Sequence, residues 1–353
     1  MQEKNWAIGV DIGIKVTQIS YMTDEMKEPE TLETLFETKE DIGFLKDCLL
    51  AVPELEELTQ IKSIVFVLPR LTLEYVGKIK AACQGMGISP DAVCVQGVQE
   101  AAIFFALSQE KSLWNNEVVF FDFSSEGMVY RRLRTGKLKN AMTAELVEED
   151  IQTFSFDKPS DEEFLRFSRE KLEKHIISAV YLIGEGFYGE PWATETLKYL
   201  CSRRRVFKGL NLYTKGAAYA AYDRIHANAF EKVIFQCKNR LRASLGIRIV
   251  YKEEPRFLYL VKAGANWCEG RALIEAIPDG ISELTFVVQN IDGTEREEIL
   301  SLKGLPERER RMTRIEISLA FVSENQAVFT VRDLGFGCFA QSSETVLRKD
   351  ICL

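Results

Sequence analysis

Apolar and polar positions along the first part of the chain predict strands that give way to alternating helices and strands. The run "WAIGVDIG" has a buried-strand pattern that stops on an acid and a glycine, and "KVTQISYM" follows at once as a second strand. We predict that "ETLETLFE" completes a β-meander. A helix over 39–51, the strand "SIVFVLP", a helix over 71–87, the strand "DAVCVQG" and the apolar helix "VQEAAIFFALSQ" are predicted to follow.

The same order of elements returns in the next stretch. "EVVFFDFSSEGMVYRRLRTGKLKNAMTAE" predicts a strand ending near an acid, a turn of small residues and two further strands. A helix follows, capped by Ser160 with Glu163 three residues on, then the strand "SAVYLIG", a helix with Pro191 in its first turn, and a last helix containing "GAAYAAYDRIH". Because one order of elements repeats, we predict two related lobes, 1–116 and 117–228.

From about residue 229 short alternating strands dominate. "TRIEISLAFVSENQAVFTVRDLGFG" alternates cleanly, with Ile315, Ile317, Leu319 and Phe321 on one face, and "SEN" and "NIDG" are hairpin turn signals. This pattern predicts an antiparallel β-sandwich over 229–353. The predicted fold class is therefore α/β, with two related lobes followed by a β-sandwich domain.

Composition narrows the possible functions. The chain has 353 residues with a formal net charge of −8, which argues against a general nucleic-acid binder. We interpret the basic clusters at 131–134, 203–205 and 308–314 as solvated faces. No stretch reaches the roughly 18 apolar residues of a membrane helix, and the first residues lack the apolar core of a signal peptide, so we expect a cytoplasmic protein. Two histidines and eight scattered cysteines without a C-x-x-C pair argue against a zinc site and against a His-based catalytic triad.

Two acid-tipped hairpins are the main candidate for chemistry. Asp11-Ile12-Gly13 closes the first predicted hairpin, and Asp122 precedes the turn 124–127 of the second. Backbone N–H groups at such a tip suit a phosphate, and the carboxylate can hold a metal through its water shell. One such hairpin is most simply an Asp in a β-turn; the repetition favours a functional interpretation, with the two acids facing each other across one cleft.

These motifs resemble the actin, sugar-kinase and DnaK-type heat-shock ATPase superfamily. The two hairpins resemble its phosphate loops, "VQEAAIFFALS" its first connecting helix, "AVYLIGEGFYGEPWATETL" its adenosine motif and "YTKGAAYAA" its second connecting helix. The resemblance covers residues 6–222, and the C-terminal strands resemble the β-sandwich of DnaK-type chaperones. It implies ATP with Mg²⁺, catalytic roles for Asp11, Asp122 and Glu100, a metal held through water by Asp11 and Asp122, and nucleotide contacts from Gly13, Ile14, Lys15, Ser124, Ser125, Gly127, Gly184, Glu185 and Gly186.

Several positions depart from the pattern of the superfamily. Ile14 replaces a hydroxyl residue of the first loop, and Ser124, Ser125 and Glu126 occupy part of the glycine stretch of the second. Side chains there narrow the approach of a phosphate to the backbone. The insertions that close over the adenine in large members are missing, so nucleotide binding should be weak and magnesium-assisted if it occurs.

The expected function is a nucleotide-gated hinge with weak or lost ATPase activity, in which the sandwich binds a protein partner or an extended peptide, as in chaperone-like or cytoskeleton-like proteins. Two alternatives stay open. One is a structural interaction module that kept the fold and lost nucleotide. The other is a small-molecule kinase, which would need a substrate-facing acid and usually larger insertions. We expect no nucleic-acid partner and no membrane span.

Overall fold

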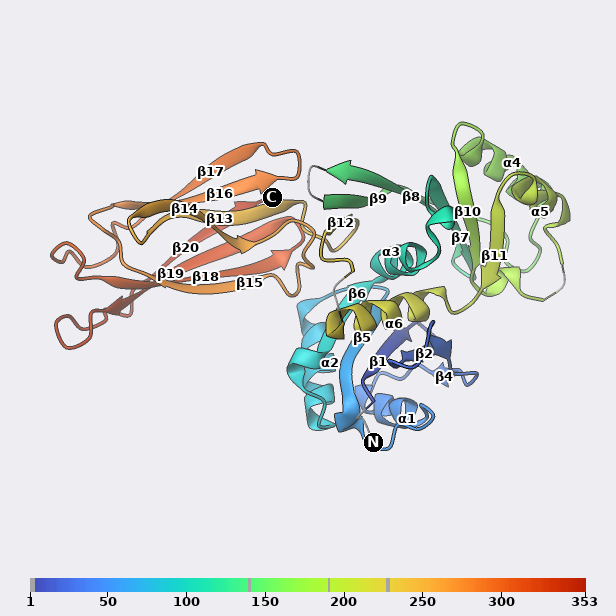
Figure 1. Cartoon of the computed structure of the whole chain (residues 1–353), viewed down its shortest axis with the longest axis horizontal. Helices are drawn as coiled ribbons and strands as arrows, with labels where there is room; N and C mark the ends of the chain where they lie inside the picture. The colour runs from blue at the N-terminus through green and yellow to red at the C-terminus, as the bar shows by residue number, and fades with distance from the viewer. Residues whose placement is uncertain (1–3, 139–140, 190, 227–228) are drawn as a thin grey trace. The chain divides into compact units, whose positions relative to one another are not determined.

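The computed structural model describes residues 4–138, 141–189, 191–226 and 229–353 (Figure 1). They divide into two compact units, Met1–Cys237 and Lys238–Leu353. The predicted boundary after Asn228 lies outside the described residues. Each unit is built on its own sheets and is described separately below.

The first lobe contains a sheet with the strand order β3-β2-β1-β5-β6. β1 pairs antiparallel with β2 and parallel with β5. The predicted continuous strand "ETLETLFE" is wrong: two short strands replace it on the outer edge of β2, and Leu35 between them is exposed rather than turned to a core. The elements of this lobe are β1 (Trp6–Ile12), β2 (Val16–Met22), β3 (Glu30–Thr31), β4 (Phe36–Glu37), α1 (Leu45–Leu50), β5 (Ile61–Leu68), α2 (Leu73–Gly85), β6 (Val93–Gly97) and α3 (Val98–Ser108).

The second lobe repeats this topology in a sheet with the order β11-β10-β7-β8-β9-β12. β7, β8 and β9 form an antiparallel meander, and β10 and β11 continue the sheet in parallel. The repeated order of a meander followed by two parallel strands, with helices between them, is the predicted actin-like fold. The elements are β7 (Glu117–Ser124), β8 (Gly127–Leu138), β9 (Ala141–Gln152), α4 (Asp161–Leu172), β10 (Ile177–Ile183), α5 (Thr194–Cys201), β11 (Arg205–Gly209), α6 (Leu212–Ile225) and β12 (Val233–Gln236).

Two helices of the second lobe have different kinds of N-terminal cap, one from the adjacent residue and one from another helix. Ser160 caps α4 as predicted, because its hydroxyl accepts a hydrogen bond of 3.3 Å from the Glu163 N–H. The predicted position of Pro191 in the first turn of the next helix is wrong, since α5 begins at Thr194. The carboxylate of Asp161 accepts the Glu195 N–H at 2.7 Å and so caps α5 from the neighbouring helix α4, which sets that start.

Helices α3 and α6 lie between the two sheets and join the lobes into one unit (Figure 1). Their small residues allow a very close approach: a Cβ atom added at Gly216 in α6 would lie 2.0 Å from the carbonyl oxygen of Ala101 in α3. Similarly, a Cβ atom at Gly9 in β1 would lie 2.3 Å from the backbone nitrogen of Ala218. The "GAAYAA" segment therefore serves close helix packing, and the connecting helices share one core with both sheets.

The second unit is a β-sandwich of two four-stranded antiparallel sheets, with orders β14-β13-β16-β17 and β15-β18-β19-β20. The four residues predicted to alternate inward in β18, Ile315 to Phe321, are buried. The rings of Phe286 in one sheet and Phe329 in the other stack with centroids 3.8 Å apart, which fixes the core between the layers. The strands are β13 (Ala243–Tyr251), β14 (Glu254–Val261), β15 (Arg271–Ala276), β16 (Glu283–Asn290), β17 (Glu295–Ser301), β18 (Arg314–Ser323), β19 (Gln326–Gly335) and β20 (Val346–Cys352).

Candidate functional site

The acid and glycine that interrupt the first strand form a tight hairpin. Asp11 lies in β1 opposite Gln18 of β2, and the N–H of Gly13 donates to the carbonyl oxygen of Val16 at 3.0 Å. A Cβ atom at Gly13 would lie 2.7 Å from that same oxygen, so the turn closes only with glycine there. The chain thus reverses immediately after the acid and resumes as β2.

The second hairpin places its acid in the matching position. Asp122 lies in β7, two residues before Ser124, which pairs with Gly127 across the turn. Gly127 has a φ of 119°, and a Cβ atom there would lie 2.6 Å from the carbonyl oxygen of Gln152. Glycine is therefore required at this position both by the backbone angle and by the neighbouring strand.

Asp11 and Asp122 act on each other electrostatically. Burial, and the charge of Asp122, raise the pKa of Asp11 to about 7. Within the described part of the chain, no side chain donates a hydrogen bond to Asp11. Two carboxylates that share a poorly hydrated site resist simultaneous ionisation, so Asp11 holds a proton more readily than an ordinary aspartate.

The Asp122 carboxylate already has partners inside the protein. The hydroxyl of Tyr213, at the start of α6, donates to its Oδ2 atom at 2.6 Å. The guanidinium of Arg131 in β8 lies 3.5 Å from the same oxygen and donates to the Tyr213 hydroxyl at 3.0 Å. Burial raises the pKa of Tyr213 well above its ordinary value, so the phenol stays protonated and donates.

Arg131 extends these contacts toward helix α3. Its Nε atom donates to Glu149 of β9 at 2.8 Å, and the other carboxylate oxygen of Glu149 accepts a hydrogen bond of 2.8 Å from Gln99. We call Gln99, Glu149, Arg131, Asp122 and Tyr213 the Arg131 network. It runs from the connecting helix α3 through three strands of the second lobe to the connecting helix α6.

The interpretation of the cluster 131–134 as a solvated face is wrong for its first two members. The side chain of Arg131 is 8% exposed and that of Arg132 is 13% exposed. Arg132 lies on the opposite face of β8, where it donates to both oxygens of Glu117 at 2.8 and 2.9 Å. Adjacent arginines in a strand serve opposite faces, and each of these two is paired with acids.

The remaining candidates from the first lobe lie in different surroundings. Glu100 is buried in the first turn of α3, where its carboxylate accepts the N–H of Gly97 at 3.3 Å and so caps its own helix. Ile14, at the tip of the first hairpin, is 66% exposed, and Lys15 beside it is also exposed. The tip of the first hairpin therefore presents the aliphatic side chain of Ile14 instead of a hydroxyl group, and the Glu100 carboxylate serves as a helix cap.

The second-lobe candidates meet around Phe123. Ser124 accepts the N–H of Glu126 at 3.3 Å within the turn, and Ser125 is exposed. A Cβ atom at Gly184, whose φ is 93°, would lie 2.3 Å from the carbonyl oxygen of Phe123, and one at Gly186 would lie 2.3 Å from the Phe123 ring. The glycine turn after β10 is thus packed directly on the second hairpin, and Glu185 between the two glycines is exposed.

An aromatic cluster supports that turn. The ring of Phe123 lies 5.8 Å from Phe187 and 5.6 Å from Trp192, and Phe187 stacks on Trp192. The Trp192 indole N–H donates to the carbonyl oxygen of Gly186 at 2.9 Å. Trp192 therefore fixes the glycine turn by packing and by one hydrogen bond.

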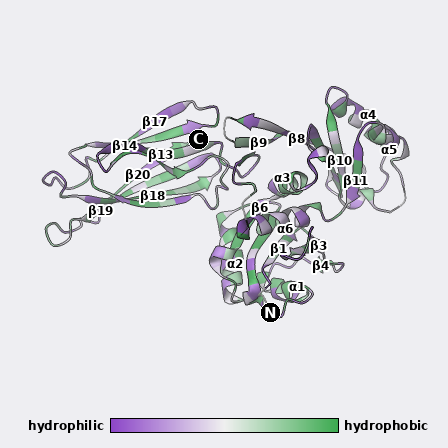
Figure 2. Cartoon of the chain, in the orientation of Figure 1, coloured by the Kyte–Doolittle hydropathy of each residue, from purple (hydrophilic) through white to green (hydrophobic). Residues whose placement is uncertain are grey.

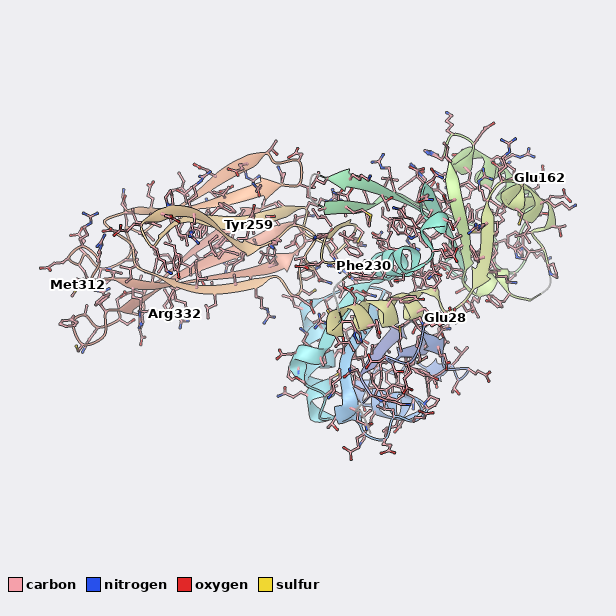
Figure 3. The ribbon with its side chains drawn as sticks, viewed as in Figure 1. Glu28, Glu162, Phe230, Tyr259, Met312 and Arg332 are labelled. Carbon is pink, nitrogen blue, oxygen red and sulfur yellow. The ribbon has the colours of Figure 1, made fainter. Side chains whose placement is uncertain are left out.

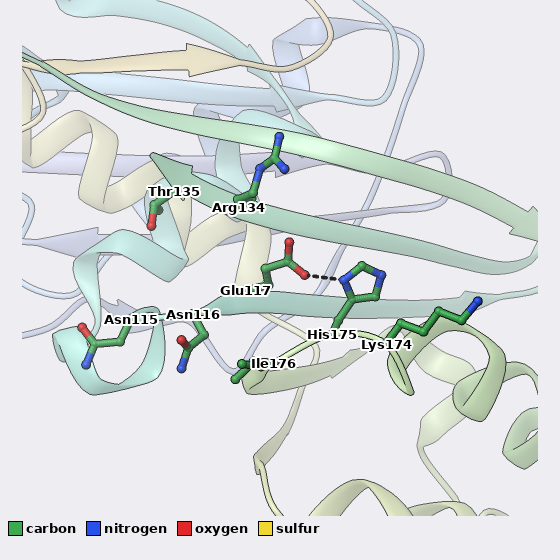
Figure 4. Close-up of a pocket in the computed structure, with 8 residues that line it drawn as sticks. All are labelled: Asn115, Asn116, Glu117, Arg134, Thr135, Lys174, His175 and Ile176. Carbon is green, nitrogen blue, oxygen red and sulfur yellow. Dashed lines mark ion pairs between the residues drawn. The ribbon is translucent and has the colours of Figure 1, made fainter. Parts of the chain in front are cut away.

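A separate pocket of about 240 Å³ lies at the other end of this sheet (Figure 4). It is lined by residues including Asn116, Glu117, Thr135 and His175, and His175 lies 3.0 Å from Glu117. Ligands of parallel α/β sheets bind at the carboxyl ends of the strands. This pocket lies where β7 and β10 begin, and Arg132 already pairs with its acid, so the acid-tipped hairpins remain the stronger candidate site.

The described residues contain no group of three or more His, Cys, Asp or Glu side chains arranged to hold a metal ion. In the same part of the chain, none of the helices combines the length and the apolar character needed to cross a membrane.

Two protein families match this chain, one in each compact unit. Residues 21–238, more than half of the sequence, match a protein family described as "Family of unknown function (DUF5716) C-terminal". The chain belongs to this family. A second pattern, "Domain of unknown function (DUF8552)", matches residues 240–353, which correspond to the β-sandwich unit. No curated protein matches the chain.

Solved structures with similarity to the chain cover its first part. An inorganic polyphosphate/ATP-glucomannokinase from Arthrobacter sp. strain KM is 15% identical, with a TM-score of 0.44 over 62% of this chain and 99% of the kinase. Component A of the (R)-2-hydroxyglutaryl-CoA dehydratase from Acidaminococcus fermentans is 10% identical, with a TM-score of 0.37 over 62% and 98%. The ethanolamine utilization protein EutJ from Carboxydothermus hydrogenoformans is 14% identical, with a TM-score of 0.36 over 61% and 89%.

Sequence reasoning missed the residues that bond to Asp122. One signal for Arg131 was present: a two-residue turn pairs Asp122 with Val129, and side chains two apart on a strand share a face, so Arg131 falls on the face of Asp122. Tyr213 and Gln99 gave no comparable signal, because their contacts depend on how α6 and α3 pack between the lobes.

Proposed function

We propose that this protein is an actin-like hinge that has lost nucleotide hydrolysis and acts by binding partners. The observation that carries the proposal is the occupation of the Asp122 carboxylate by Tyr213 and Arg131. A carboxylate that holds the water shell of Mg²⁺ needs its lone pairs for that water. Arg131 supplies a fixed positive charge where a metal would otherwise balance the acid.

The residues around the hairpins do not fit a magnesium-nucleotide complex well. Ile14 presents an aliphatic side chain at the tip of the first loop, and Ser124 uses its hydroxyl within the turn of the second. Glu126 adds a negative charge beside the place a phosphate would approach. The proposed catalytic residue Glu100 caps α3. These features support loss of hydrolysis more than they support a kinase.

The Arg131 network supports a hinge whose angle is set from within. It connects α3 and α6, the two helices that run between the lobes. A change in the angle between the lobes would have to break or rearrange these partly buried bonds, so the network would favour one angle over others. We propose that a partner, rather than ATP, shifts this balance.

We further propose that the β-sandwich carries a partner site in the loops at one end. The strand registers bring together the loops 252–253, 277–282, 302–313 and 336–345 at that end, where Met312 lies in Figure 3. Large apolar side chains stand exposed there, among them Tyr251, Ile281 and Phe339, the last with 75% of its surface exposed. Such residues at loop tips are typical anchors for a protein or peptide partner.

Isothermal titration of the full chain with ATP, with and without magnesium, tests the loss of nucleotide. We expect no magnesium-dependent binding to the wild-type protein. Binding that requires magnesium and disappears in the double variant Asp11→Ala and Asp122→Ala would overturn the proposal and favour a weak nucleotide-binding hinge. The variant Glu170→Ala, altered at an exposed position on α4 outside the predicted site residues, is the control for nonspecific effects on folding.

A further inference from the structure

The free edge of the second-lobe sheet has the features of a docking strand. β11 pairs in parallel with β10, from Arg205 opposite Ala179 to Gly209 opposite Ile183. Within the described residues no strand pairs with its other side. Alternate residues of such a strand point their N–H and C=O groups away from the sheet, so β11 offers backbone groups to an added strand.

The exposed charges on this edge are basic. Arg203, Arg205 and Lys208 are exposed, and in the described part of the chain none of them pairs with a carboxylate. Arg205 donates to the neutral hydroxyl of Ser112, and Lys208 lies 4.5 Å from the ring centroid of Tyr188. Because the whole chain carries a net charge of −8, a basic edge of this kind is complementary to an acidic partner.

An aromatic residue stands in the middle of the same strand. Phe207 is 40% exposed, and its ring stacks on Tyr181 of β10 with centroids 5.2 Å apart. Tyr181 in turn stacks on buried Phe120 of β7 at 5.5 Å. The row holds Phe207 in a fixed orientation, so a partner would meet a rigid apolar contact at little cost in conformational entropy. Figure 2 shows hydrophilic stretches in β11 beside the largely hydrophobic β10.

We propose that β11 is a docking strand for an extended acidic segment of a partner protein. The segment would add to the sheet through backbone hydrogen bonds, place carboxylates against Arg203, Arg205 and Lys208, and cover Phe207 with an apolar side chain. A single-stranded nucleic acid could use the charges and the ring, but the outward backbone groups of β11 have their natural complement in another strand. β11 lies two strands away from Asp122 in the same sheet, and the proposed docking contacts use none of the residues of the Arg131 network.

Fluorescence anisotropy with the full chain tests the proposal. The probe is a labelled extended peptide with Glu at consecutive positions on both sides of a central Trp, so that carboxylates fall on both faces of the added strand. Its control has Lys in place of every Glu. We expect the acidic peptide alone to bind. The variant Arg203→Glu, Arg205→Glu and Lys208→Glu should weaken binding by roughly tenfold, as expected for three modest exposed charge contacts. Backbone amides of β11 should gain protection from hydrogen exchange when the peptide binds.

A control variant makes the same total change in charge at three positions away from β11. Lys39→Glu, Lys46→Glu and Arg70→Glu alter three exposed positions of the first lobe and should leave peptide binding unchanged. Absence of binding by the acidic peptide, or equal weakening by both variants, would overturn the proposal. Tighter binding of oligouridylate that the first variant abolishes would assign the edge to nucleic acid. Self-association in sedimentation that only this variant abolishes would assign it to a second copy of the chain.

Discussion

The hydroxyl group of Tyr213 donates a hydrogen bond of 2.6 Å to the Oδ2 atom of Asp122, and this contact ties helix α6 to strand β7. The donor comes from the helix that packs on the first lobe, and the acceptor comes from the sheet of the second. The Tyr213 side chain is buried and the Asp122 carboxylate is partly buried, so removing the hydroxyl group costs Asp122 its shortest hydrogen bond. The bond therefore contributes both to stability and to the relative position of the lobes.

Removing this hydroxyl should destabilise the first unit. In Tyr213→Phe, Asp122 and Arg131 each lose a partner while the ring and its packing remain, so we expect the free energy of unfolding to fall by roughly 1–2 kcal/mol. Urea unfolding followed by circular dichroism measures the change. Tyr222→Phe alters a partly exposed tyrosine on the same helix and is the control. Equal stability of the two variants would mean that the Tyr213 hydroxyl has no structural role.

The crossing of α3 and α6 should not tolerate a side chain at Gly216. In Gly216→Ala the new methyl group would lie 2.0 Å from the Ala101 carbonyl oxygen, which forces the helices apart. We expect a loss of roughly 2 kcal/mol or more in stability, as in other overpacked cores. Gly77→Ala in α2 is the matched control, because a Cβ atom there meets nothing within 4 Å. It should stabilise the protein by about 0.5–1 kcal/mol, since alanine favours the helix. Similar effects of both changes would contradict the close crossing.

Asp11 should make stability depend on pH in a direction opposite to that of most aspartates. Its pKa in the folded state, about 7, lies above the ordinary value of 3.8, so the folded protein binds a proton more tightly than the unfolded chain. The corresponding stabilisation is complete at pH below the ordinary value and is lost as the pH rises through about 7.

The variant Asp11→Asn removes this titration. With a chelator present, its stability relative to the wild-type protein should increase between acidic pH and pH 8, because only the wild-type protein must bury the charge at pH 8. Thermal unfolding of both proteins across that range measures the difference. A difference that stays constant with pH would show that Asp11 titrates as an ordinary surface acid.

The sequence predicted the elements of the fold better than it predicted the contacts between lobes. Apolar runs located β1, β2 and β7 because these strands are buried along most of their length. The segment "ETLETLFE" lies at the edge of a sheet, its apolar residues Leu32, Leu35 and Phe36 do not alternate, and two short strands form there instead of the predicted continuous one. The start of α5 was misplaced because its cap comes from Asp161 in another helix.

The candidate site was predicted only in outline. The positions of the hairpin acids follow from local turns, which the sequence determines. Whether a carboxylate is open to a ligand depends on side chains from distant segments, such as Tyr213 for Asp122. A pattern within one strand cannot contain that information, although the shared face of Asp122 and Arg131 could have been deduced from the hairpin register.

The last prediction concerns the anchor of the loop 336–345 in the β-sandwich. Asp333 at the end of β19 is fully buried and accepts hydrogen bonds of 2.6 and 2.7 Å from Arg308. It also accepts the N–H groups of Ser343 and Gly335, which fixes both ends of the loop. The Arg308 guanidinium holds the pKa of Asp333 well below its usual range. The carboxylate is therefore charged at neutral pH, and the stabilisation is lost only as the pH falls through the folded pKa.

Arg308→Met leaves that charge buried without its partner and should cost roughly 3 kcal/mol of stability in the second unit. Arg310→Met is the matched control: Arg310 also pairs with an aspartate, Asp279, but its side chain is 71% exposed. The control should have a much smaller effect, because solvent screens an exposed ion pair. Hydrogen exchange of the amides in β19 and β20 measures both effects in the full chain. If the proposed partner site depends on a fixed loop, Arg308→Met should also increase exchange across 336–345 at neutral pH. Unchanged exchange there would mean that the buried pair does not hold the loop. In that case backbone contacts within the loop would fix Phe339, such as the hydrogen bond of 2.7 Å from the Phe336 N–H to the Ala340 carbonyl oxygen.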